Sequence, residues 1–91
     1  MVEPVLKTIE ELVTVIYDME QTTLHTHFQK LIDTLSTFLN DMFQAGYSVL
    51  LDEELIRLQE CYERQDYVEM ADLLLYELKP ELEQLKEELA E

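Results

Sequence analysis

The sequence predicts an all-α fold, an antiparallel bundle of three to four helices within a single domain that spans residues 1–91. The chain of 91 residues has one glycine, two prolines and no tryptophan, too few turn residues for an all-β or Rossmann-like fold. Leucine and glutamate, which favour helices, are abundant. Apolar residues also recur at alternating steps of three and four, the helical period.

The first helix is predicted over about residues 4–20. Pro4 is favoured in a first helical turn. The run 13–17 is rich in β-branched residues, but the longer helical period outweighs this signal for a strand. The apolar stripe behind the prediction is Val5, Ile9, Leu12, Ile16 and Met19.

The second helix is predicted over about residues 23–45. Near residues 20–23 the apolar phase slips by one residue, which favours a break or sharp kink, with Thr22 or Thr23 as the cap. The alternative is one long helix with a local bulge. The helix should end near Ala45, because Gly46 suits a left-handed C-terminal cap. Its stripe is Leu24, Phe28, Leu31, Leu35, Phe38 and Met42.

Two further helices are predicted over about residues 50–64 and 67–89. Ser48 or Asp52 can start the third, and Asp66, with Glu69 three residues on, forms a variant of the capping box at the start of the fourth. An interior proline normally breaks a helix, but the apolar phase does not reset after Pro80, so a kinked, continuous helix is expected. The two stripes are Leu51, Leu55, Leu58 and Tyr62, then Val68, Ala71, Leu75, Leu78, Leu82, Leu85 and Leu89.

The segment 66–80 is the most informative part of the chain. Nine of the thirteen residues that follow Asp66 are apolar, so this helix should be buried by more than one neighbour. Beyond Pro80 only a narrow leucine seam remains, which suits packing along a single neighbour, as in a coiled coil. The segment is therefore expected to form the core or to meet a partner.

The net charge limits the kinds of partner that the chain can bind. The chain carries -15, with 7 acidic and 2 basic residues in 1–45 and 14 and 4 in 46–91. This field repels nucleic acid and anionic lipid, so neither is an expected partner. The acidic surface is either a solubilising one, a site for a basic partner or a mimic of nucleic acid. A single cysteine and the lack of a signal-peptide pattern favour the cytoplasm.

No motif points to catalysis, a cofactor or a metal. Glycine-rich phosphate loops and nucleophile elbows are absent from the sequence, and Cys61 has no neighbouring base in the sequence. On a helix His25 and His27 diverge by about 200°, so they do not chelate one ion together. We therefore expect a protein that is not an enzyme and has no cofactor.

The second helix also avoids charge at its non-apolar positions, which indicates either the centre of a contact surface or an ordinary bundle helix. These positions are Thr26, Gln29, Thr34, Ser36, Thr37, Asn40 and Gln44. The candidate partner or dimer contacts are Phe28, Leu31, Leu35, Phe38, Met42, Tyr67, Met70, Leu74, Tyr76, Leu82, Leu85 and Leu89.

The segment 66–80 resembles small, acidic, all-helical proteins of Firmicutes that share the pattern D-Y-x-x-x-A-D-L-L-x-Y-E-L-x-P. This resemblance implies a partner-holding role rather than catalysis. Residues 62–80 are more weakly similar to one tetratricopeptide hairpin, but Gln65 replaces the favoured glycine and no second copy follows.

The leading hypothesis is a non-enzymatic protein-interaction module, adaptor-like or export-chaperone-like. We expect it to form a homodimer, and a helical or basic protein segment is the expected partner. The alternative is a purely structural self-association domain. A metal-binding or catalytic helical bundle is the third possibility.

Overall fold

Almost every residue that the structure describes is helical, so the predicted all-α fold class is confirmed. The computed structural model describes residues 2–49 and 51–89, and no strand occurs among them. Two compact units divide the chain, residues 1–50 and 51–91, and each is antiparallel within itself. The prediction that they make one domain stays a prediction. The elements are α1 (Glu3–Tyr17), α2 (Gln21–Gln44), α3 (Asp52–Glu63), α4 (Tyr67–Leu73), η1 (Leu74–Leu78) and α5 (Lys79–Glu88).

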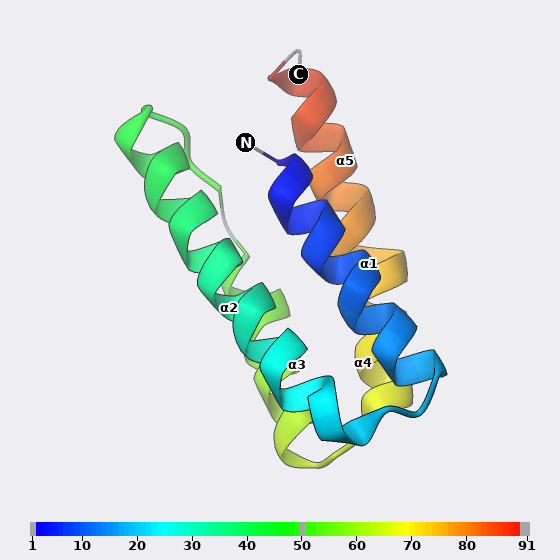
Figure 1. Ribbon diagram of the computed structural model, residues 1–91. Helices are drawn as coiled ribbons and strands as arrows, with labels where there is room; N and C mark the ends of the chain where they lie inside the picture. Colours follow the sequence, from blue (N-terminus) through cyan, green and yellow to red (C-terminus); the bar gives the residue numbers. More distant parts are fainter. Residues whose placement is uncertain (1, 50, 90–91) are drawn as a thin grey trace. The chain divides into compact units, whose positions relative to one another are not determined.

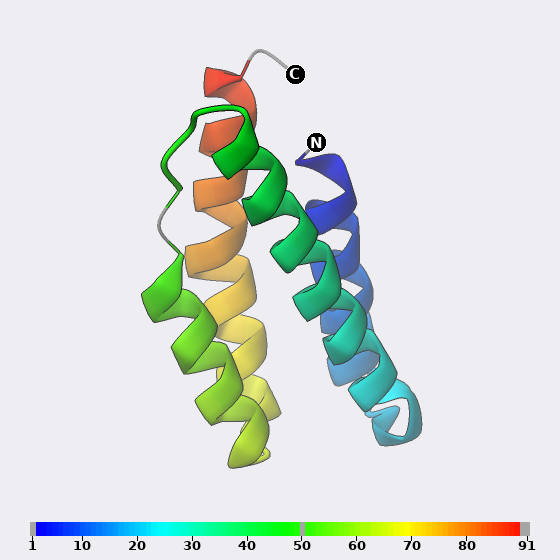
Figure 2. The same ribbon diagram turned by 90° about the vertical axis from the view of Figure 1, so that its left-hand side faces the viewer.

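The first unit is an antiparallel hairpin of α1 and α2, which lie side by side in Figures 1 and 2. The predicted break between them is confirmed, and one long helix is excluded. Met19 adopts a left-handed backbone with φ 58° and its side chain is 80% exposed, so its predicted place in the apolar stripe was wrong. A left-handed residue turns the chain out of the helix, which carries the side chain away from the helix face.

Neither threonine caps α2. The helix begins at Gln21, and its N-cap residue is Glu20, whose side chain makes no capping bond. The Thr23 hydroxyl donates to the Glu20 carbonyl oxygen at 3.4 Å, because Thr23 already lies inside the first turn. At the other end Gly46 takes φ 89°, and the Tyr47 amide donates to the Met42 carbonyl at 3.0 Å. This left-handed ending confirms the prediction for Gly46.

The core of the first unit is the apolar stripe of α2 together with a broad face of α1. All six residues of the predicted α2 stripe are buried. Eight of the 15 residues of α1 are buried, one of them Thr8. The Thr8 hydroxyl donates to the Val5 carbonyl at 2.7 Å, which satisfies this polar group inside the core.

The second unit pairs α3 with the helix that follows it. α3 begins at Asp52 after an N-cap residue, Leu51, without a side-chain cap; the predicted start at residue 50 lies outside the described residues. The turn at 64–66 contains Gln65 with φ 58°. Asp66 caps α4, accepting a hydrogen bond from the Glu69 amide at 3.2 Å. Glu69 does not complete the capping box, because its carboxylate pairs with Arg64 instead.

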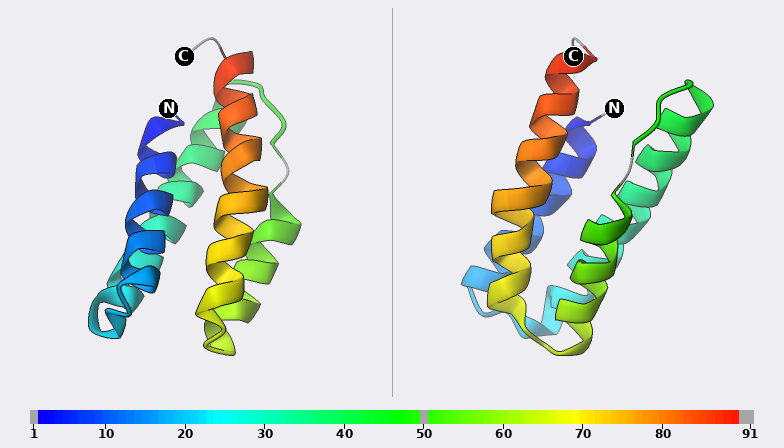
Figure 3. Two further views of the ribbon diagram at one scale, coloured as in Figure 1. Left: turned by 90° about the vertical axis from the view of Figure 1, so that its right-hand side faces the viewer. Right: turned by 180° about the vertical axis from the view of Figure 1, so that it is seen from behind.

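Beyond Asp66 the chain forms a continuous helix from Tyr67 to Glu88, built from α4, η1 and α5 (Figure 3). Continuity through Pro80 is therefore confirmed. η1 is a π-helical turn that ends two residues before the proline. A π turn widens the helix where Pro80 lacks an amide hydrogen and crowds the preceding turn, so the helix accepts the proline without ending.

The π turn also changes which residues of this helix are buried. The buried row is Met70, Leu74, Leu78 and Leu82, at steps of four residues. Steps of four drift around a pure α-helix, but one wider turn keeps them on one side. Val68 is 72% exposed and Leu75 is half-buried. The predicted stripe was therefore wrong at Val68. Ala71 and Leu73, on either side of the buried row, are also buried.

Candidate interaction surface

The outer side of α4 and η1 carries two large apolar side chains in water. Val68 and Tyr76 are each 72% exposed, and the exposed Asp72 lies between them in steps of four residues. Leu75, beside Tyr76, is half-buried. Residues four apart on a helix are neighbours on its surface. We call Val68, Asp72, Leu75 and Tyr76 the Val68–Tyr76 face.

An ion pair next to this face ties η1 to α3. The guanidinium of Arg57 donates two hydrogen bonds to the Glu77 carboxylate, at 2.7 and 2.8 Å. Hydrogen bonding to Arg57 lowers the pKa of Glu77, and the same bond raises that of Arg57. A bidentate geometry fixes orientation as well as distance. Glu77 therefore points to α3, and its neighbour Tyr76 is left on the outer side.

The surroundings of the face are acidic. From Tyr67 to Glu88 the helix carries seven carboxylates and two lysines. Among the residues that the structure describes, neither a hydrogen bond nor an ion pair engages the Asp72 carboxylate. Apolar side chains flanked by such carboxylates suit a partner with apolar and cationic groups.

One turn beyond the Arg57–Glu77 pair, two carboxyl groups meet. Burial raises the pKa of Glu81 above its ordinary 4.5, and the nearby Glu54 of α3 raises it further through charge and a hydrogen bond. Two carboxylates at one place disfavour each other's ionised form. α3 therefore makes an attractive pair with η1, Arg57–Glu77, and a repulsive pair with α5, Glu54–Glu81.

Most of the predicted partner contacts are buried within this chain. Tyr67, Leu85 and Leu89 are half-buried, and Tyr76 is the exposed member of the set. The sequence reasoning missed Val68 as a surface residue, because the predicted stripe did not include the phase shift that the π turn introduces. The buried members are Phe28, Leu31, Leu35, Phe38, Met42, Met70, Leu74 and Leu82.

The side chains of Cys61 and His27 belong to α3 and α2, respectively. Cys61 is buried, and burial raises the pKa of its thiol, which lowers the thiolate fraction that a nucleophile needs. His27 Nδ1 lies 2.9 Å from the Thr23 carbonyl oxygen. Within residues 2–49 and 51–89, histidine, cysteine and acidic side chains form no group able to hold a metal ion.

Comparison with known proteins assigns a family. None of the helices in the described part combines the length and apolar character needed to cross a bilayer. No curated protein and no solved structure matches the chain. A family model described as a domain of unknown function, DUF8042, matches residues 1–88. The chain therefore belongs to the DUF8042 family.

Proposed function

We propose that this protein is a non-enzymatic interaction module of the cytoplasm, adaptor-like or export-chaperone-like, whose Val68–Tyr76 face binds a segment of another protein. The exposure of Val68 and Tyr76, 72% each, carries the proposal. Covering such side chains removes apolar surface from water at about 25 cal/mol per Å². Tyrosine, with an apolar ring and a polar tip, is common in binding hot spots.

A helix is the best-matched partner element. Val68, Asp72 and Tyr76 form a straight row on a helix surface, and rows of this kind pack against rows on a second helix. An amphipathic helix that places its apolar residues at similar steps would meet Val68 and Tyr76 together.

The partner segment is basic. The Asp72 carboxylate lies at the centre of the face, and the helix carries seven carboxylates against two lysines. A lysine or arginine opposite Asp72 would form a charge-assisted hydrogen bond. At this face a second copy of the chain is the weaker candidate, because two copies with a net charge of -15 repel each other. The expected homodimer stays a prediction.

Site-specific photo-cross-linking in the native host tests the proposal. Benzoylphenylalanine replaces Tyr76 in one variant and, as a matched control, Ile56 in another; Ile56 is 55% exposed on α3. We expect position 76 to cross-link a different protein, at a segment that contains lysine or arginine. Position 56 should give little of this product, and adding Val68→Ser should reduce the product at position 76.

Two results would count against the proposal. Equal cross-linking from positions 56 and 76 would show that the face has no special affinity. A product that joins only two copies of this chain would support the structural self-association domain instead.

A further inference from the structure

A groove in the first unit is the second place where the molecule can hold a ligand. It lies between the beginning of α1 and the C-terminal half of α2, and its volume is about 340 Å³. This volume is near the lower limit of typical ligand pockets, about 300 Å³. The lining residues are Pro4, Val5, Asp33, Thr34, Thr37, Phe38 and Asp41.

The groove combines an apolar floor with an acidic wall. Val5 and Phe38 are buried and form the floor. Asp33, Thr37 and Asp41 follow one another on α2 at steps of four residues, so they form a single row on its surface. At 1.5 Å per residue, the two aspartates are about 12 Å apart along the helix axis.

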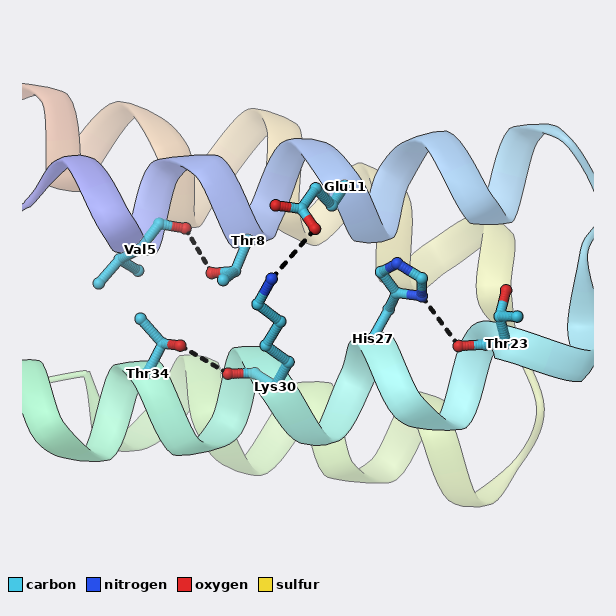
Figure 4. Close-up of polar contacts among 7 residues, drawn as sticks. All are labelled: Val5, Thr8, Glu11, Thr23, His27, Lys30 and Thr34. Atoms are coloured by element: carbon cyan, nitrogen blue, oxygen red, sulfur yellow. Dashed lines mark hydrogen bonds and ion pairs between the residues drawn. The ribbon is translucent and has the colours of Figure 1, made fainter.

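The polar groups that line the groove present oxygen atoms to a ligand. The Thr34 hydroxyl donates its hydrogen to the Lys30 carbonyl at 2.7 Å, so its oxygen can still accept a bond. Figure 4 shows Val5 and Thr34 pointing into the space between α1 and α2. Asp33 accepts one hydrogen bond, from Gln29 at 3.0 Å, which leaves carboxylate lone pairs for a second donor.

Neither lysine of the first unit lines the groove. The Lys30 ammonium lies 3.3 Å from Glu11 Oε2, across the two helices (Figure 4), and Lys30 does not line the groove. Lys7, one turn after Pro4, is exposed and does not line it either. A ligand that supplies cationic donors therefore complements the lining.

The size of the groove restricts the shape of the ligand. A helical segment is about 10 Å across with its side chains, which is too wide for 340 Å³ over the distance between the aspartates. A single extended alkyl chain is slender enough. Its methylene groups would leave water on contact with the apolar floor, which favours binding.

We propose that this groove binds a linear aliphatic polyamine. One terminal ammonium group pairs with Asp33 and the other with Asp41, while the methylene chain lies along Pro4, Val5 and Phe38. The inference is independent of the partner proposed for the Val68–Tyr76 face, since it rests on residues of the first unit alone.

Nuclear magnetic resonance titration of the full chain with spermidine tests the inference. We expect saturable amide shifts concentrated on the seven lining residues. Asp33→Asn together with Asp41→Asn should weaken binding about tenfold, the sum expected for two exposed ion pairs. Glu60→Gln, which removes an exposed carboxylate from α3, is the matched control and should change the affinity less than about twofold.

A comparison of two diamines of equal charge distinguishes the effect of ligand length on affinity from the effect of ligand charge. Diaminooctane, with terminal amino groups, spans roughly the distance between the aspartates, whereas diaminopropane reaches one of them only. The inference predicts that the longer diamine binds several-fold more tightly. Equal affinities, equal binding of Mg²⁺, or shifts spread evenly over the acidic surface would show ordinary counter-ion attraction and overturn the proposal.

Discussion

Helix α1 and the segment 67–78 are both rich in apolar residues, yet they use them differently. In α1 eight of 15 residues are buried. The segment 67–78 has nine apolar residues among twelve, of which five are buried, while Val68 and Tyr76 remain 72% exposed. Apolar density therefore predicts that a helix forms, but not that each of its sides is covered. An uncovered side of this kind is where a partner is best sought.

The largest difference in stability is expected between a substitution on the buried side of η1 and one on its exposed side. Leu74 is 0% exposed and Tyr76 is 72% exposed. Leu74→Ala should lower the free energy of unfolding by about 2–5 kcal/mol, because it opens a cavity in the core. Tyr76→Ser should change it by less than about 0.5 kcal/mol. Urea denaturation measures both values, and similar losses would contradict the assignment of the two sides.

A smaller difference in stability is expected between substitutions of the N-cap residues of α4 and α2. Asp66 caps α4 through its side chain, whereas Glu20 makes no such bond at α2. Asp66→Ala should therefore cost about 1 kcal/mol of stability, and Glu20→Ala should cost close to nothing. Thermal or urea denaturation of the two variants checks this difference; equal losses would show that the Asp66 cap adds no stability.

The smallest effect concerns the pH dependence of the α3–α5 contact. Burial and Glu54 raise the pKa of Glu81, so the folded state binds this proton more tightly than the unfolded chain. Ionisation above the ordinary value of 4.5 therefore lowers stability. Glu81→Gln should raise stability at neutral pH by up to about 0.5 kcal/mol, and the gain should fade as Glu81 becomes protonated in acid.

Glu77 titrates in the opposite sense. The hydrogen bond with Arg57 lowers the pKa of Glu77. The contribution of Glu77 to stability is therefore present above 4.5 and is lost as the pH falls through the lowered value.

Glu83→Gln, an exposed change on the same helix, is the control for Glu81→Gln. Identical pH profiles for the two variants would contradict a special role for the Glu54–Glu81 pair.

Local signals explain what could be predicted from the sequence. The break before α2, the left-handed ending at Gly46 and the Asp66 cap each depend on a few adjacent residues, which the sequence shows directly. Pro80 was correctly expected to sit inside a continuous helix. These features establish the fold class and most helix ends.

The candidate sites depend on less local information. The π turn before Pro80 shifts the helical phase, and this shift moved Val68 from the expected core to the surface. The groove depends on the pairing of α1 with α2, which brings Pro4 and Asp41 to one place although they are far apart in the sequence. Neither the wider turn nor the alignment of two helices follows from an apolar pattern alone.

The double substitution Val68→Ser with Tyr76→Ser tests the central claim most directly. Partner capture from the native host and urea denaturation are measured on the same preparations, at low and high salt. We predict that the captured partner is lost, that wild-type capture weakens with salt, and that the unfolding midpoint stays near that of the wild type. An unfolding midpoint lowered as much as by the core substitution Leu74→Ala, or partner capture that persists, would contradict the claim.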